Sequence, residues 1–141
     1  MKSIHELPLS LGIHSTYKGY HYLVTALELA IQNEDNLIFV TKNIFPIVAR
    51  KYHTNVHCVE RNIRTIILNC WNSPYRKTLQ EIAPCPLYKP PSVGEFIDIL
   101  FWKIKSYEGI EQTKIEYIST IVTETSIITR TNVITECEIQ K

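Results

Sequence analysis

The charged side chains of Glu60, Arg61 and Arg64 have the types and spacing that base recognition in duplex DNA requires. Arginine can donate two hydrogen bonds to the O6 and N7 atoms of guanine, and glutamate can accept one from the N4 amino group of cytosine. At about 100° per residue, a helix through this stretch places these three side chains on one face with His57. The opposite face is apolar and suited to packing: Val56, Val59, Ile63, Ile66, Ile67 and Cys70.

The same spacing also fits a helix that only faces water. Glu60 and Arg64 are four positions apart, and an ion pair at this spacing stabilises a helix by only a few tenths of a kcal/mol. From this helix alone, base reading and a solvated surface are equally good interpretations.

Metal and catalytic chemistry are poorly supported. His53, His57 and Cys58 are the only cluster of ligand types, and the two histidines share a helix face only if one helix runs through both. The Thr54-Asn55 pair between them predicts a turn instead, so we expect no metal and no cofactor. The sequence has no glycine-rich phosphate loop and no nucleophile elbow, which argues against an enzyme. No Cys-x-x-Cys spacing occurs, so we expect separate reduced thiols at Cys58, Cys70, Cys85 and Cys137.

Positive charge is concentrated in the middle of the chain. The formal net charge is only +1, but residues 41–77 carry +6 and residues 110–141 carry −2. The cations of the central stretch are Lys42, Arg50, Lys51, Arg61, Arg64, Arg76 and Lys77, against the single acid Glu60. A local basic surface of this kind suits a polyanionic partner.

The helix that carries the charged face is predicted to follow a second, shorter helix. Pro46 suits the first position of a helix, where its missing N–H is not needed, so we expect a helix over residues 46–52. Thr54 and Asn55 then supply a turn and an N-cap for a helix over residues 56–72. Ala49 would let the two helices approach closely. Two helices joined by a tight turn make a helix-turn-helix candidate.

Two further amphipathic helices flank this motif. Apolar side chains recur at helical spacing in two sets, which are Tyr20, Leu23, Val24, Leu27 and Ile31, and Val93, Phe96, Ile97, Leu100, Phe101 and Ile104. With 141 residues, 45% of them hydrophobic, the chain can bury the core of one domain. The sequence shows no run of about 20 apolar residues and no signal peptide, so we expect a cytoplasmic protein without a membrane partner.

The sequence resembles the C-terminal effector domain of the stage-zero sporulation response regulator of spore-forming bacteria. The matching residues lie in family order between about residues 3 and 108 and are His5-Glu6, Lys18-Gly19-Tyr20, Tyr22-Leu23, Thr41-Lys42, Pro46, Ala49, Val59-Glu60-Arg61, Ile63-Arg64, Trp71, Lys89-Pro90 and Glu95-Phe96-Ile97. The resemblance implies a compact domain of about six helices around a central helix-turn-helix. It also implies sequence-specific binding of double-stranded DNA by a bacterial transcription regulator, often as tandem domains.

The resemblance gives the base-reading role to Glu60, Arg61 and Arg64, on a helix that enters the major groove. The family usually has arginine where this chain has Cys58, and histidine where it has Thr65, so base specificity is expected to differ at these supporting positions. No receiver module precedes residue 1, so we expect either a stand-alone paralogue or a fragment.

Phosphate contacts, which fix the register on DNA, are expected from Lys51, Asn55 and His57. The alternative function is a protein-interaction module or antagonist that keeps the fold without specific DNA reading. Cys58, Thr65 and the acidic C-terminal stretch motivate this alternative, whereas retention of the three base-reading side chains argues against it.

The C-terminal stretch has a different composition. Ile, Val and Thr dominate, and the segments 115–117, 119–122, 126–129 and 133–139 favour strands. A hairpin alone is marginal in water, so three interpretations stay open: strands that pair between chains in a homodimer, a segment packed on its own domain, and a partly disordered segment. The predicted fold class is therefore mainly α, a helical bundle over residues 1–109, followed by a short β-rich C-terminal extension over residues 110–141.

Overall fold

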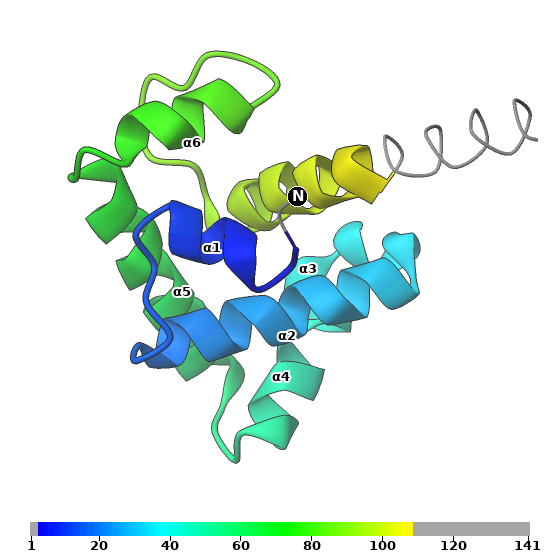
Figure 1. Ribbon diagram of the computed structural model, residues 1–141. Coiled ribbons are helices and arrows are strands. Elements are labelled where there is room, and N and C mark those ends of the chain that lie inside the picture. Colours follow the sequence, from blue (N-terminus) through cyan, green and yellow to red (C-terminus); the bar gives the residue numbers. More distant parts are fainter. Residues whose placement is uncertain (1–2, 109–141) are drawn as a thin grey trace, which may run out of the picture. The chain divides into compact units, whose positions relative to one another are not determined.

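The computed structural model describes residues 3–108, in which helices follow one another without a strand (Figure 1). The chain divides into two compact units, residues 1–105 and residues 106–141, and the packing described below belongs to the first. The elements are α1 (Glu6–Ser10), α2 (Lys18–Gln32), the 3-10 segment η1 (Glu34–Leu37), α3 (Val40–Asn43), α4 (Phe45–Lys51), α5 (Val56–Trp71) and α6 (Arg76–Ile82). A last helix covers residues 93–108.

The predicted fold class is wrong in one part. The helical bundle is confirmed, but a β-rich extension is not seen, because the described residues contain no strand and residues 110–141 lie outside them. That prediction used only the local preference of Ile, Val and Thr for extended backbone. Such a preference depends strongly on context, since a strand is stable only when neighbours supply hydrogen-bond partners and cover. The fold is mainly helical.

The core is a single cluster built mostly from α2, α5 and the helix over residues 93–108. Of the apolar set predicted on α2, Tyr20, Leu23, Val24 and Leu27 are buried and Ile31 is partly buried. Every residue of the set predicted on the last helix is buried: Val93, Phe96, Ile97, Leu100, Phe101 and Ile104. Hydrophobic periodicity therefore identified the faces that hold the unit together.

Helices α2 and α5 pack closely at Gly19. A Cβ atom added at Gly19 would lie 2.7 Å from the backbone oxygen of Asn62 and 2.9 Å from Cγ2 of Ile66. Backbone therefore packs against backbone, and no side chain larger than hydrogen fits without moving α2 away from α5. In contrast, a Cβ added at Gly94 would meet nothing within 4 Å.

The last helix begins with a reciprocal capping box. The backbone N–H of Glu95 donates to Oγ of Ser92 at 3.2 Å, and the backbone N–H of Ser92 donates to Oε1 of Glu95 at 2.9 Å. Hydrogen bonds from the backbone N–H and the side chain of Ser92 stabilise the ionised carboxylate and lower the pKa of Glu95. The cap fixes where this helix starts.

The two glycines give opposite predictions for the same substitution. Gly19→Ala should lower the free energy of unfolding by about 1–3 kcal/mol, because overpacking outweighs the gain in helix propensity. Gly94→Ala should leave it unchanged or raise it by up to about 1 kcal/mol, because only the propensity changes. Urea unfolding followed by circular dichroism measures both. Equal effects of the two substitutions would contradict the close packing of α2 on α5.

Candidate nucleic-acid interface

Helix α4 ends in a Schellman motif that turns the chain toward α5. The backbone N–H of Thr54 donates to the carbonyl of Ala49 at 2.9 Å, and that of His53 donates to the carbonyl of Arg50 at 3.3 Å. His53 has a φ of 55°, in the left-handed region that such a turn requires and that glycine usually supplies. The predicted turn is confirmed, but its left-handed residue is His53, which sequence reasoning missed because histidine is an uncommon choice there.

Asn55 starts α5 as its N-cap. Its backbone is extended, with φ −120° and ψ 164°, and its Oδ1 accepts a hydrogen bond from the backbone N–H of Cys58 at 2.8 Å. Both helices of the predicted motif are confirmed: α4 covers Phe45–Lys51 where residues 46–52 were predicted, and α5 covers Val56–Trp71 where residues 56–72 were predicted.

The motif is anchored to α2 at its turn. The hydroxyl groups of Tyr52 and Thr25 are 2.9 Å apart and hydrogen-bonded, and the rings of Tyr52 and Tyr22 are 5.2 Å apart. Thr25 is the one buried polar residue of the described core, so this hydrogen bond satisfies a group that would otherwise be costly to bury.

The far end of α5 is held by Arg76. Its Nε donates to the backbone oxygen of Trp71 at 2.6 Å, and its guanidinium lies 4.4 Å from the centre of the Trp71 ring. Helix α5 is therefore fixed at both ends, by Asn55 and the turn at one and by Arg76 at the other. A rigid helix presents its exposed side chains in a defined geometry.

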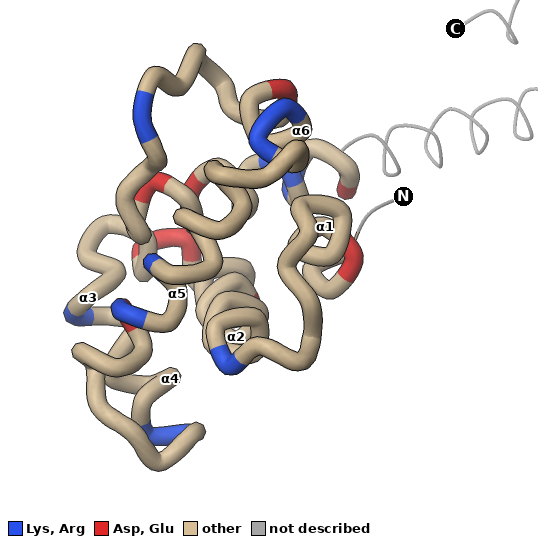
Figure 2. Tube along the Cα trace, turned by 90° about the vertical axis from the view of Figure 1, so that its left-hand side faces the viewer, with Lys and Arg blue, Asp and Glu red and all other residues tan. Residues whose placement is uncertain are grey.

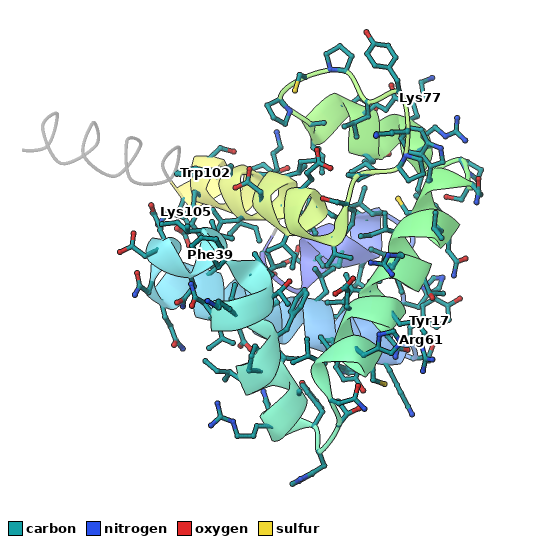
Figure 3. All side chains as sticks on the ribbon, turned by 180° about the vertical axis from the view of Figure 1, so that it is seen from behind. Tyr17, Phe39, Arg61, Lys77, Trp102 and Lys105 are labelled. Atoms are coloured by element: carbon teal, nitrogen blue, oxygen red, sulfur yellow. The ribbon has the colours of Figure 1, made fainter. Side chains whose placement is uncertain are left out.

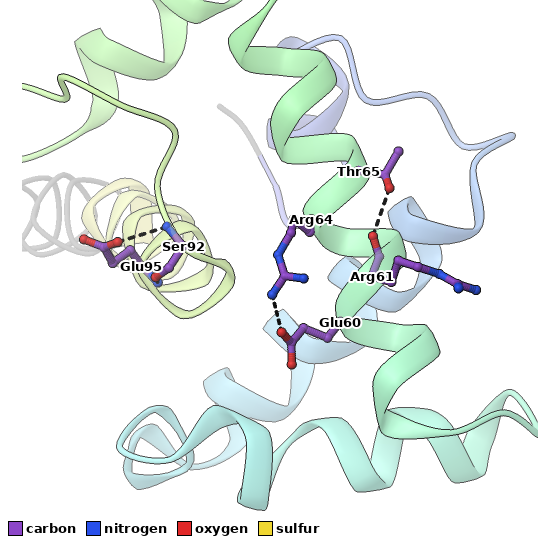
Figure 4. A network of polar contacts seen from close by, with 6 residues as sticks. All are labelled: Glu60, Arg61, Arg64, Thr65, Ser92 and Glu95. Atoms are coloured by element: carbon purple, nitrogen blue, oxygen red, sulfur yellow. Dashed lines mark hydrogen bonds and ion pairs between the residues drawn. The ribbon is translucent and has the colours of Figure 1, made fainter.

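The exposed face of α5 has two sides (Figure 4). On one side Arg64 forms an ion pair with Glu60. The side chain of Arg64 is 55% exposed and that of Glu60 is 33% exposed. On the other side Arg61 is exposed, and its backbone oxygen accepts a hydrogen bond from the hydroxyl of Thr65 at 3.0 Å. The intrahelical pair that the spacing allowed is present in the free protein, and it leaves Arg61 on the opposite side of the face.

Cys58 belongs to the side of Arg61. The side chain of Thr54 hydrogen-bonds the thiol and, helped by the positive charges of Arg61 and Lys18, lowers the pKa of Cys58 against the opposing effect of partial burial. Nδ2 of Asn62 donates to the backbone oxygen of Cys58 at 2.8 Å and lies 3.4 Å from its Sγ. The thiol of Cys58 therefore ionises more readily than the ordinary thiol that sequence alone indicated.

The remaining predicted residues lie at the start of α5 or just before it. Lys51 is exposed at the end of α4, with its Nζ 5.3 Å from the centre of the Tyr52 ring. His57 is exposed in the first turn of α5, and Asn55 is exposed at its start. The structure therefore places Cys58, Arg61 and Thr65 on one side of the face. Sequence reasoning gave no site role to Lys18, Thr54 or Asn62. Of these, Asn62 is on α5 itself and Thr54 just precedes it, whereas Lys18 comes to this side only through folding.

Positive charge near α5 comes from more than one helix. Figure 2 shows Lys and Arg positions on α2, α4 and α5 in the view that faces α5.

Across residues 3–108 no group of three His, Cys, Asp or Glu side chains could hold a metal ion. None of the helices described is long and apolar enough to cross a membrane.

The site consists of a short helix, a tight turn with one residue in the left-handed region, and a longer helix with a charged exposed face. This arrangement is a helix-turn-helix of the DNA-binding class. Residues 4–104 match the family described as sporulation initiation factor Spo0A C terminal, and the chain belongs to this family. The C-terminal domain of Spo0A is the DNA-binding domain of a sporulation transcription factor. The family resemblance seen in the sequence is therefore confirmed.

The left-handed turn residue makes a stability prediction. His53→Val should lower the free energy of unfolding by about 1–2 kcal/mol, because a β-branched residue is strained at positive φ. His53→Gly should be neutral or slightly stabilising. The matched control His57→Val, made at an exposed helical position, should change stability by only a few tenths of a kcal/mol. Thermal unfolding of the three variants measures this, and a tolerated His53→Val would contradict the turn.

The thiol environments make a reactivity prediction. Near neutral pH, iodoacetamide should alkylate Cys58 much faster than Cys70, because the pKa of Cys58 is lowered whereas burial raises that of Cys70 to about 11. Thr54→Val removes the hydrogen bond to the thiol and should slow modification of Cys58. Peptide mapping by mass spectrometry gives the rates. Equal rates at Cys58 and Cys70 would contradict the described environment.

Proposed function

We propose that residues 1–109 bind double-stranded DNA sequence-specifically, as a bacterial transcription regulator of the sporulation-initiation type, with α5 in the major groove. The observation that carries this proposal is the exposed face of α5, where Glu60, Arg61 and Arg64 stand on a helix fixed at both ends. An α-helix fits the major groove, and these side chains can pair with guanine and cytosine. Family membership supports the same function.

The ion pair between Glu60 and Arg64 does not prevent base reading. Both side chains are partly exposed, so the pair contributes at most about 1 kcal/mol to the free protein. A bidentate contact between arginine and guanine contributes about 1–3 kcal/mol of discrimination, which exceeds the cost of opening the pair. We infer that Arg61 is the main base-reading cation, because the described residues form no ion pair with it, and that Glu60 and Arg64 exchange their mutual contact for base edges.

The surrounding residues support the orientation on DNA. Lys51, Asn55 and His57 border the face and suit contacts to phosphate. At Cys58 and Thr65 the side chains are short, and the hydroxyl of Thr65 already donates to the backbone of its own helix. Direct readout therefore depends on few long side chains. Binding as tandem domains or as a homodimer would compensate by doubling the contacts.

An interaction module without specific DNA reading is the second candidate function. The internal hydrogen bond of Thr65 and the Glu60–Arg64 ion pair favour it, since both satisfy polar groups without DNA. The exposed guanidinium of Arg61 argues against it. Only the DNA-binding function predicts that binding depends on base sequence.

Two substitutions separate base reading from phosphate contact. Arg61→Ala should cost about 1–3 kcal/mol on the preferred site and relax sequence preference, whereas Lys51→Ala should weaken all DNA alike. The preferred duplex is first selected from a random pool with the unsubstituted chain. Fluorescence anisotropy then compares this duplex with a scrambled one at low and near-physiological salt.

The control is Lys105→Ala on the last helix, which removes a cation outside the basic stretch of residues 41–77 and far from Arg61 in Figure 3, and should leave sequence preference unchanged. Failure to select any preferred duplex, or equal effects of Arg61→Ala on both duplexes, would overturn the recognition-helix proposal and favour the interaction module.

A further inference from the structure

The first turn of α2 lies against the half of α5 that carries Cys58 and Arg61. Gly19 sets this position, because its backbone is close enough to the backbone oxygen of Asn62 that an added Cβ would lie 2.7 Å from it. Lys18 is the residue next to this contact and the first residue of α2. Its backbone is therefore held at the edge of the charged face, although it lies 40 positions before Cys58 in sequence.

The electrostatics of Cys58 agree with this position of Lys18. Lys18 is exposed, and its positive charge, like that of Arg61, helps to lower the pKa of the Cys58 thiol. Two cations from different helices thus act on one short side chain of α5. The neighbouring Tyr17 is 43% exposed, so the start of α2 faces solvent at this point. The start of α2 therefore borders this side of α5, and Lys18 is the second cation there.

The dimensions of the major groove give this second cation a role. The groove is about 12 Å wide and a helix with its side chains is about 10–12 Å across, so the edges of a helix in the groove face the two sugar-phosphate backbones. Cys58 is too short to fill the space at the edge beside Arg61. The flexible ammonium group of a lysine that borders this edge suits a phosphate oxygen.

We propose that Lys18 is a positioning residue that binds a backbone phosphate next to the bases read by Arg61, and so fixes the register of α5 on DNA. This inference rests on the proposed function. It differs in kind from base reading, because a phosphate contact contributes to binding of any sequence and carries no sequence preference.

The salt dependence of binding tests this role of Lys18. The slope of log K against log salt concentration falls by about 0.9 for each phosphate that the protein no longer neutralises. Lys18→Ala should reduce the slope by this amount and weaken the selected and scrambled duplexes by the same factor. Lys18→Arg should restore the slope, and the control Lys105→Ala, outside the basic stretch of residues 41–77, should keep it. Thermal unfolding of Lys18→Ala should match that of the unsubstituted chain, because the side chain is exposed.

DNA in which single phosphates are replaced by an uncharged group identifies the phosphate that Lys18 binds. The selected duplex is prepared with single methylphosphonate substitutions at successive positions, each of which removes one negative charge. The unsubstituted chain should lose affinity at a phosphate that flanks the selected guanine, and Lys18→Ala should be insensitive to that same substitution while responding to the others.

The outcomes separate the two proposals. An unchanged slope in Lys18→Ala, with selective binding by the unsubstituted chain intact, would overturn the role of Lys18 alone. A loss in Lys18→Ala that is confined to the selected duplex would also overturn it, because it would indicate base reading. Absence of selective binding by the unsubstituted chain would overturn the proposed function, and the role of Lys18 that rests on it as well.

Discussion

The close packing of α2 on α5 at Gly19 is the constraint on which the rest of the unit depends. Helix α5 is amphipathic, and its apolar face must be buried for the charged face to be held outward. The absence of a side chain at Gly19 brings α2 within reach of the backbone at Asn62, which covers that apolar face and places the start of α2 beside it. The turn before α5 and the cation-π interaction at Trp71 then fix its two ends.

Much of this architecture could be predicted because it depends on local pattern. Apolar periodicity and the signals at Pro46 and Asn55 predicted α2, the two helices of the motif and the last helix. Ends were predicted only for the two helices of the motif, and each lies within one residue of the observed end. The short elements α1, η1, α3 and α6 were not predicted, since a helix of one or two turns shows too little periodicity to identify. The predicted β-rich extension was wrong as part of the fold class, because strand preference without a known partner is weak evidence.

The candidate site was predictable on α5 itself and not beyond it. The positions of Glu60, Arg61 and Arg64 follow from helical spacing alone. The surroundings of Cys58 could not be predicted in this way, because they involve Thr54 across a turn and Lys18 across 40 positions of sequence. Histidine in the left-handed position was equally hidden, since only the backbone geometry distinguishes it from an ordinary polar turn residue.

The Glu60–Arg64 ion pair also affects how the molecule would approach a polyanion. Opposite charges held together cancel beyond a few ångströms, so this side of α5 is nearly neutral when seen from a distance, whereas Arg61 and Lys18 keep a positive field on the other. The net positive charge on the exposed face of α5 therefore lies on the Arg61 side. Among the side chains of α5, long-range attraction to a polyanion should therefore come mainly from Arg61 and not from Arg64.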